Sequence, residues 1–253
     1  MIYDFQRASM LKRAMAWLLD IIMVITIAVG CAWGITKFID VMPDANTISA
    51  AIDKHEKAFG GYLSVPYSEY EKMSDAEKKE ADAISDQIAQ ALNEDTEAIQ
   101  AMERFITKLL LIISLSFLGA FLIWELIIPL LLKNGQTLGK KCFGIALMRK
   151  DGVKVTPFMI FARAILGKYT VETMLPIMIL ISFFSSFGLL ISAVILLAQI
   201  VIPFATRNKT AIHDLMACTV AVDLGSQMIF NSTEEMVEYH KRIHEEIAKD
   251  ADY

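Results

Sequence analysis

Two acidic residues lie inside stretches of sequence that are otherwise apolar. Asp20 falls in RAMAWLLDIIMVITIAVG, residues 13–30, and Glu125 falls in a second apolar stretch, where Thr107 and Ser114 share its helical face. An acid in the hydrocarbon core costs roughly 2.5 kcal/mol or more unless it is paired, protonated or hydrated, so it is by default a candidate functional residue. Two acids at similar depth can share a proton or flank a cation, since like charges raise the pKa of one of them. The pattern therefore predicts chemistry of protons or monovalent cations.

Asp20 needs a basic partner from another segment of the chain. Arg13 lies on the same helical stripe, but it is about 10 Å away along the axis and points toward the cytoplasmic headgroups. We expect Asp20 to be held by Arg163 or by the region around His213, which precedes Asp214. Histidine can change charge near neutral pH, although neighbours on a helix point about 100° apart. The alternative role of these residues is to lock helix packing. The predicted polar cluster comprises Arg13, Asp20, Glu125, Arg163, His213 and Asp214.

Long apolar blocks must position these residues. The blocks cover residues 14–39, 105–132 and 171–206, and each exceeds the roughly 20 residues that a helix needs to cross a bilayer. The third block fits either one overlong tilted helix or two short helices that fold back at Ser185-Ser186-Phe187-Gly188. We predict an all-α membrane protein with four transmembrane helices.

The distribution of basic residues predicts the orientation of these helices. Lys and Arg precede the first block and are frequent between the second and third, so both regions should face the cytoplasm. Arg207 and Lys209 follow the third block and also favour the cytoplasm, which requires that this block cross the membrane twice. We therefore expect a multi-pass protein with both termini in the cytoplasm.

An acidic segment separates the first two blocks. Residues 40–103 contain fifteen Asp or Glu and five Lys, which excludes a nucleic-acid partner on that face. Ser74 and Glu77 have the spacing of a capping box, so helices should rise from there into the second block, whereas the upstream part with Gly60, Gly61 and Pro66 should be a loop. The extracytoplasmic insertion, 40–104, is predicted to be a solvated helical extension; a ligand-binding domain is the alternative.

The predicted cytoplasmic segment between the second and third blocks, residues 133–170, has a regular pattern of its own. Alternation around Asp151-Gly152 predicts a short β-hairpin, and the mixture of apolar and basic residues after Pro157 predicts an interfacial helix. Lys140 and Lys141 stand beside glycines but do not form a phosphate-binding loop. We expect Lys140, Lys141 and Lys168 to bind anionic lipid headgroups.

The rest of the sequence argues against an enzyme. The acidic cytoplasmic tail, 223–253, should form a short exposed helix, in which His240 and His244 have metal-ligand spacing but lack a third ligand. The sequence contains no HExxH, GxSxG or P-loop motif, and its three cysteines predict no disulfide framework. We predict no metal and no cofactor, although motifs alone do not exclude an intramembrane hydrolase that uses Asp20 and Glu125.

Several segments together resemble the RDD family of bacterial membrane proteins. They are Arg13 and Asp20 in the first block, NGQTLGKKCFGIALMRKDG after the second, and KTAIHDLMACTVAV near the end. The resemblance covers residues 8–222, and the arginine and two aspartates of the family name match Arg13, Asp20 and Asp214. Glu125 resembles an acid that often precedes the GQT-like motif. The acidic insertion and the long third block depart from short members.

The resemblance implies a protein of the bacterial cytoplasmic membrane. It suggests transport of ions or of unknown ligands, and the intramembrane acids Asp20 and Glu125 favour protons, monovalent cations or a small solute coupled to one of them. The alternative is a regulator, assembly factor or scaffold for another membrane protein. Four helices form a thin bundle, so a transport pathway would require a homo-oligomer or a membrane-protein partner.

Overall fold

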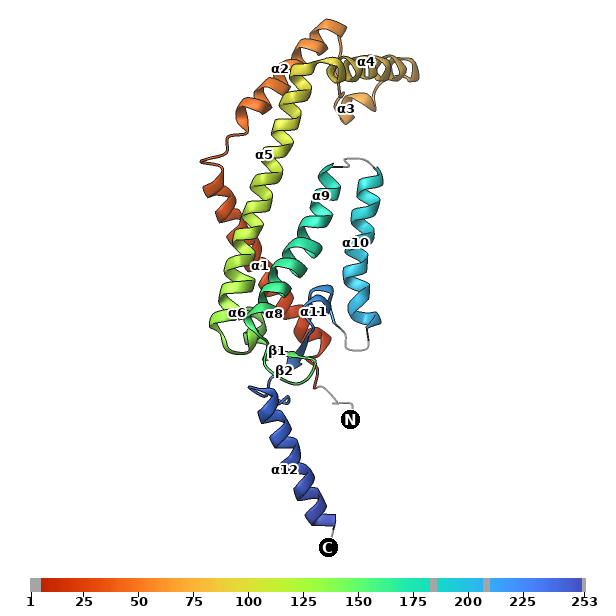
Figure 1. Ribbon diagram of the computed structural model, residues 1–253. Helices are drawn as coiled ribbons and strands as arrows, with labels where there is room; N and C mark the ends of the chain where they lie inside the picture. Colours follow the sequence, from red (N-terminus) through yellow and green to blue (C-terminus); the bar gives the residue numbers. More distant parts are fainter. Residues whose placement is uncertain (1–5, 183–185, 207–209, 252–253) are drawn as a thin grey trace. The chain divides into compact units, whose positions relative to one another are not determined.

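Four helices of this protein are long and apolar enough to cross a membrane. The computed structural model describes residues 6–182, 186–206 and 210–251 and is mostly helical (Figure 1). The four candidate spans are Met10–Ile35, Thr96–Leu131, Pro157–Ile181 and Phe187–Ala205. The predicted helical membrane fold with four spans is therefore confirmed.

The chain forms two compact units, Met1–Ala32 with Ser114–Tyr253, and Trp33–Ile113. The first unit contains most of the spans. Its elements in chain order are α1 (Met10–Ile35), the end of α5 (Thr96–Phe121), the π-helical segment η1 (Leu122–Ile127), α6 (Ile128–Leu131), the 3-10 turn η2 (Lys133–Gly135), α7 (Leu138–Cys142), β1 (Ile145–Arg149), α8 (Pro157–Phe161), the π-helical segment η3 (Ala162–Met174), α9 (Leu175–Ser182), α10 (Ser186–Ala205), α11 (Ile212–Met216), β2 (Thr219–Asp223) and α12 (Thr233–Ala251).

Helix α1 has one buried face with a repeat of four residues. Ala16, Asp20, Val24 and Ala28 are buried, so Asp20 lies on the same face as the small apolar residues that pack against the bundle. Val24 and Ala28 belong to a core cluster with Ala120, Phe121 and Trp124. Other apolar side chains of the span, including Ile22 and Val29, are exposed, as expected for helix surfaces that face lipid.

The third span begins earlier than the sequence pattern indicated. We predicted an interfacial helix after Pro157 and a span from residue 171, but α8, η3 and α9 follow one another directly from Pro157 to Ser182. Thr156 caps α8 through its side chain, and proline at the first position fits a helix start. The basic residues within the span are neutralised by acids, as described below, so they do not keep it at the interface.

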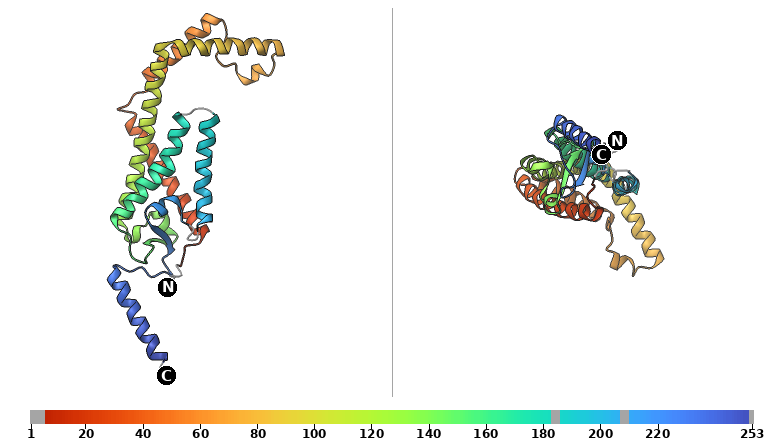
Figure 2. Two further views of the ribbon diagram at one scale, coloured as in Figure 1. Left: turned by 45° about the vertical axis from the view of Figure 1, so that its right-hand side comes forward. Right: turned by 90° about the horizontal axis from the view of Figure 1, so that it is seen from below.

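The third apolar block does contain a fold-back, because α9 and α10 are separate helices. Figures 1 and 2 show them side by side. Ser192 Oγ on α10 donates a hydrogen bond to the carbonyl of Pro176 on α9 (3.1 Å). Ser185 at the predicted fold-back, and Arg207 and Lys209 on which the orientation depended, lie outside the described residues.

The small sheet pairs segments that are distant in sequence. Strand β1 pairs with β2 in antiparallel register, with Leu147 opposite Ala221. The predicted hairpin partner was wrong: Met148 and Lys154 share a single bridge, and the tight turn is closed by a hydrogen bond from Arg149 N to Val153 O (2.8 Å). Four of the five residues in each strand are buried, so β1 pairs best with another buried strand.

The second unit contains α2 (Met42–Phe59), α3 (Tyr67–Tyr70), α4 (Asp75–Glu94) and the first part of α5. The capping box of Ser74 and Glu77 is confirmed at the start of α4. We had predicted that the part upstream of Ser74 is a loop. In the structure α2 covers most of it, and the helix is capped at Gly60, which has a left-handed backbone.

A buried acid holds two helices of the second unit together. Asp44 on α2 accepts hydrogen bonds from Arg104 (2.8 Å) and Lys108 (2.6 Å) on α5. The bonds from Lys108 and Arg104 hold the pKa of Asp44 below its usual range.

The predicted helix of the tail is present as α12. Glu235 N donates to Ser232 Oγ (3.2 Å), while the Glu235 carboxylate accepts a hydrogen bond from Asn231 N (2.8 Å). The start of α12 packs near the turn after β1, because Met236 Sδ lies 3.7 Å from a Cβ built at Gly152.

Candidate functional site

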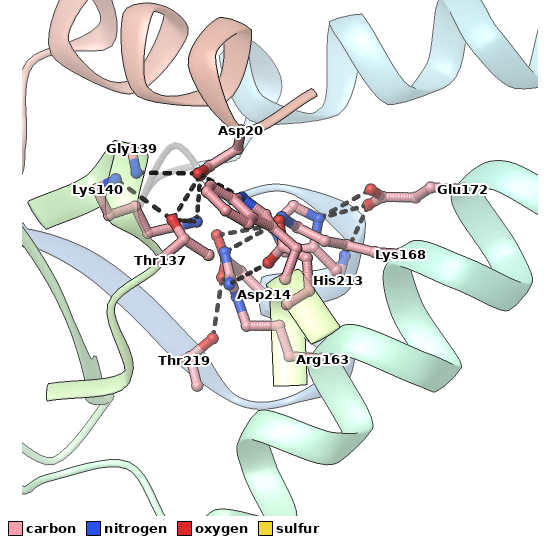
Figure 3. Close-up of polar contacts among 12 residues, drawn as sticks. Asp20, Thr137, Gly139, Lys140, Arg163, Lys168, Glu172, His213, Asp214 and Thr219 are labelled. Carbon is pink, nitrogen blue, oxygen red and sulfur yellow. Dashed lines mark hydrogen bonds and ion pairs between the residues drawn. The ribbon is translucent and has the colours of Figure 1, made fainter. Parts of the chain in front are cut away.

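Buried and partly buried charged residues of the first unit meet at one place, which we call the polar cluster. They come from α1, η1, α7, η3 and α11 (Figure 3). The members of the polar cluster are Arg13, Asp20, Glu125, Lys140, Arg163, Lys168, Glu172, His213 and Asp214. All six residues of the predicted cluster are among them.

Asp20 is surrounded by hydrogen-bond donors. Its Oδ1 accepts from Trp124 Nε1 (3.0 Å) and from the backbone N–H of Gly139 (3.1 Å). Its Oδ2 accepts from Thr137 Oγ1 (2.6 Å) and Lys140 Nζ (3.1 Å). Both carboxylate oxygens are therefore occupied. The expectation that Arg163 or the His213 region holds Asp20 was wrong, because the turn before β1 supplies the partners instead.

The turn of residues 137–140 is shaped to approach α1 closely. Thr137 caps α7 by accepting a hydrogen bond from Lys140 N. A Cβ at Gly139 would lie 2.5 Å from the Ala16 carbonyl oxygen and 2.6 Å from Asp20 Oδ1, so only glycine fits at this position. The sequence NGQTLGKK thus combines a cap, a close approach and a cation to bind one carboxylate.

Glu125 has different partners. It forms an ion pair with Lys168, and Arg163 Nη1 lies 3.9 Å from its Oε2. Among the described residues, Oε2 is buried and has no hydrogen-bond partner. We had predicted that Asp20 and Glu125 share a proton or flank a cation; instead, each carboxylate is paired with a lysine of its own.

Asp214 links three segments of the first unit. It accepts hydrogen bonds from Arg163 Nε (2.8 Å) and Thr219 Oγ1 (3.0 Å) at Oδ1, and from Arg13 Nη2 (3.4 Å) at Oδ2. Burial, the largest single influence, would raise the pKa of Asp214, but the interactions with Arg163, His213 and Arg13 together outweigh burial and the pKa is lowered. We had expected Arg13 to extend to the headgroups. Instead it pairs with Asp214.

His213 is held between an acid and an arginine. Its backbone N–H and Nδ1 both bond Glu172 (2.9 Å and 2.8 Å to Oε1), and Arg163 Nη2 lies 3.0 Å from its Nε2. Arginine can only donate, so Nε2 accepts and Nδ1–H donates to Glu172, which is the neutral ring. Burial, the largest influence, lowers the pKa of His213 and favours the same form.

Close packing against η3 sets the position of His213. A Cβ at Gly167 would lie 2.6 Å from His213 Cβ and 2.7 Å from its Cα. The absence of a side chain at Gly167 therefore lets α11 lie directly on the third span, with Asp214 against Arg163.

The charges of the polar cluster balance. Four carboxylates (Asp20, Glu125, Glu172 and Asp214) face four Lys or Arg groups (Arg13, Lys140, Arg163 and Lys168), while His213 is neutral. Burial of Lys140 lowers its pKa, and the nearby positive charge of Lys168 lowers it further, to about 8. The acids Glu125 and Asp20 act in the opposite direction. The cluster therefore includes a lysine whose pKa lies well below the usual value for that group.

Two of the three lysines expected to bind lipid headgroups are inside the bundle. Lys140 and Lys168 are each 8% exposed and are paired with Asp20 and Glu125, respectively. Burial and pairing keep these two ammonium groups from a headgroup surface. Lys141 is exposed, and its contact with headgroups stays a prediction.

Four charged members of the polar cluster lie in π-helical segments of the second and third spans. Glu125 is in η1, and Arg163, Lys168 and Glu172 are in η3. In a π-helix, residues five apart in the sequence lie next to each other. Thr173 Oγ1 accordingly donates a hydrogen bond to the carbonyl of Lys168 (2.8 Å). Such segments are rare and are frequently found at functional sites.

Four contributors were missed from the sequence: Trp124, Thr137, Glu172 and Thr219. Trp124 and Thr137 bind Asp20, Glu172 binds His213, and Thr219 binds Asp214. Glu172 could have been found, because it is an acid in a predicted apolar block, as Asp20 and Glu125 are. The other three are uncharged, and their types and spacing gave no signal.

In the part of the chain that the structure describes, no group of three or more His, Cys, Asp or Glu side chains is arranged to hold a metal ion. Asp20, Glu125 and Asp214 lie against Lys and Arg groups, which stabilise their ionised carboxylates.

Comparison with known protein families gives a match. The family model described as the RDD family matches residues 7–218, which is most of the chain. No curated protein and no solved structure matches the sequence.

Proposed function

Because this chain belongs to the RDD family, we propose that it transports protons or monovalent cations, or a small solute coupled to one of them, across the bacterial cytoplasmic membrane. The observation that carries the proposal is the charge-balanced polar cluster, in which acids and bases of the spans meet the α7 and α11 segments. The role is non-catalytic: the protein moves an ion and makes no covalent bond to a substrate.

The energetics of buried charge support a functional role. Removing ions from water costs several kcal/mol per ion, and apolar residues of similar volume often stabilise a protein as well as a buried ion pair does. Charges inside a membrane bundle are therefore expected where they serve a pathway or a relay. Asp20, Glu125 and Arg163 are each at most 5% exposed, so this argument applies to all three.

The cluster could couple proton movement to a change in helix packing. Protonating one carboxylate removes one of the balanced charges and leaves its lysine or arginine without a counter-ion. In a low-dielectric site that imbalance is costly, so the helices would favour a second arrangement that admits water or an ion. Coupling of this kind requires pairs that join different elements, as Asp20 to Lys140 and Asp214 to Arg163 do.

The proposal includes an orientation. The acidic second unit would face the outside, and the basic residues around β1, together with both termini, would face the cytoplasm, according to the positive-inside rule. Lys141 would meet anionic headgroups on the cytoplasmic side.

Flux measurement tests the proposal directly. Purified protein would be placed in liposomes that contain a pH-sensitive dye, and proton, sodium or potassium gradients would be imposed. We expect saturable flux from the wild type and loss of that flux in Asp20→Asn. Asp44→Asn is the matched control, because Asp44 is also buried and paired with two bases but lies in the second unit.

A second candidate function is that of a regulator or scaffold for another membrane protein. The observation that favours it is that every carboxylate of the polar cluster has a basic or imidazole partner, as expected of a lock between helices. A folded wild-type protein that gives no flux under any imposed gradient would overturn the ion-transport proposal and favour this candidate.

A further inference from the structure

The four carboxylates of the polar cluster are not equivalent in their hydrogen bonding. Asp20 has two donors on each oxygen, and Asp214 has a donor on each. Glu172 receives His213 Nδ1 at both of its oxygens (2.8 Å and 2.9 Å). Among the described residues, Glu125 differs because its buried Oε2 has no hydrogen-bond partner. A buried acceptor without a partner is costly and calls for an explanation.

We infer that Glu125 is the proton-binding residue of the polar cluster and that the proton binds at its Oε2 atom. Asp20, by contrast, anchors the turn of residues 137–140. The inference rests on the proposed function and deepens it, since it assigns the coupling step to one atom.

The proton-binding step is a simple acid–base reaction. A hydronium ion gives its proton to Oε2, an O–H bond forms there, one bond of the hydronium breaks and a water molecule is left. The reverse step returns the proton to water. The new O–H is a donor, and the carboxyl group has lost the negative charge that paired with Lys168.

The charges around Glu125 favour release of the proton. From η3 it faces Lys168 and Arg163, with Glu172 and Tyr169 on the same segment, and Lys140 of α7 lies close enough to interact with it. Segments α6 and α8, which also pack against η1, contribute no titratable side chain. Two cations next to the carboxylate stabilise it once the proton has left.

The location of Glu125 connects proton binding to helix geometry. Glu125 lies in η1, while Lys168 and Arg163 lie in η3, so the ion pair joins two π-helical segments. Its neighbour Trp124 donates to Asp20, which couples the same turn to α1. Loss of the Glu125–Lys168 pair would therefore weaken the contact between the second and third spans. The hydrogen bonds of Asp20 would still hold the turn of residues 137–140 against α1.

Infrared difference spectroscopy tests the assignment without depending on transport. The full-length protein in lipid would be titrated from high to low pH, and the C=O stretch of a protonated carboxylic acid would be recorded. We expect a band that is lost in Glu125→Gln and retained in Asp20→Asn. A band that is absent from the wild type, or unchanged in Glu125→Gln, would overturn the inference.

Two further measurements separate this inference from the proposed function. Glu125→Asp keeps a carboxyl group, so the band should shift in frequency and not disappear, which covers the case in which Glu125→Gln does not fold. In liposomes, Glu125→Gln should lose proton-coupled flux. Flux that persists in a folded Glu125→Gln variant would reject the inference and leave the transport proposal standing. A Glu125 band in a protein without flux would reject the transport proposal alone.

Discussion

Lys140 Nζ donates to Asp20 Oδ2 at 3.1 Å, although the two residues are 120 positions apart in the sequence. The pair joins the first span to the turn that leads into β1, with both side chains buried. A local stretch of sequence that looked like a lipid-binding patch is therefore part of the interior of the bundle.

The Asp20–Lys140 pair should be energetically coupled. Lys140→Met leaves the carboxylate without its cation, and removing one partner of a buried pair typically costs about 3–5 kcal/mol. In the double variant Asp20→Asn/Lys140→Met we expect less destabilisation than the sum of the single changes, by about 0.5–3 kcal/mol, as for residues in contact. Unfolding in detergent micelles, followed by tryptophan fluorescence, measures all four proteins. Strict additivity would show that the pair contributes nothing.

Gly139→Ala should displace Asp20 and its partners. The new Cβ would meet the Ala16 carbonyl oxygen and Asp20 Oδ1, both closer than 3.0 Å. The first atom belongs to the backbone, and the second is held by hydrogen bonds from Trp124 and Gly139. We expect a lower melting temperature and loss of flux. Gly30→Ala is the control, since a Cβ there meets nothing within 4 Å and alanine favours a helix by up to about 1 kcal/mol over glycine. Equal melting temperatures for the two variants would contradict the close approach.

Gly167→Ala should loosen α11 without touching Asp20. The added methyl group would press on the Cβ and Cα of His213, so α11 must move away from η3 and weaken the bond between Arg163 and Asp214. We expect increased hydrogen exchange over residues 211–217, measured by mass spectrometry. Exchange that is unchanged there, or that rises equally in Gly30→Ala, would show that this contact does not position α11.

The titration of Lys140 should appear in the pH dependence of stability. Its pKa falls from the usual 10.5 to about 8 in the folded protein, so the unfolded chain binds more protons between these values and stability rises with pH in that window. We expect the melting temperature of the wild type, relative to Lys140→Gln, to increase from pH 8 to pH 10. A difference that stays flat or decreases over this range would contradict the direction of the shift.

Labelling of single cysteines checks the proposed orientation. Ser68 and Lys150 are both exposed, and one lies in the second unit while the other lies in the turn after β1. In a background without Cys31, Cys142 and Cys218, an impermeant maleimide should label Ser68→Cys on intact spheroplasts and Lys150→Cys only after permeabilisation. The reverse pattern would invert the orientation.

The spans and the helix caps could be predicted because their signals are local. Apolar length is sufficient to define a span, and Ser74 with Glu77 defines a helix start within four residues. The partner of β1 could not be read in the same way. Asp151-Gly152 does form a tight turn, but the buried β2 strand, far along the chain, pairs better than the short segment after the turn.

The polar cluster was predictable as a set of residues but not as a set of contacts. Asp20, Glu125 and Asp214 stand out as acids, whereas the choice between Arg163 and Lys140 as the partner of Asp20 depends on how η3 and the turn of residues 137–140 pack. The π-helical geometry of η3 changes which residues share a face, and no pattern of four-residue repeats reveals it.

The position of Asp214 in the chain also determines when the cluster can be completed during synthesis. Asp214 and β2 follow the fourth span, whereas Arg163 belongs to the third. Because synthesis proceeds from the N-terminus, the first three spans enter the membrane while Arg163 still lacks the Asp214 carboxylate. A chain that stops before α11 keeps that excess positive charge, which is costly in a bilayer. Unfinished copies thus differ electrostatically from finished ones, because the charge of Arg163 is balanced by Asp214 only in the finished chain.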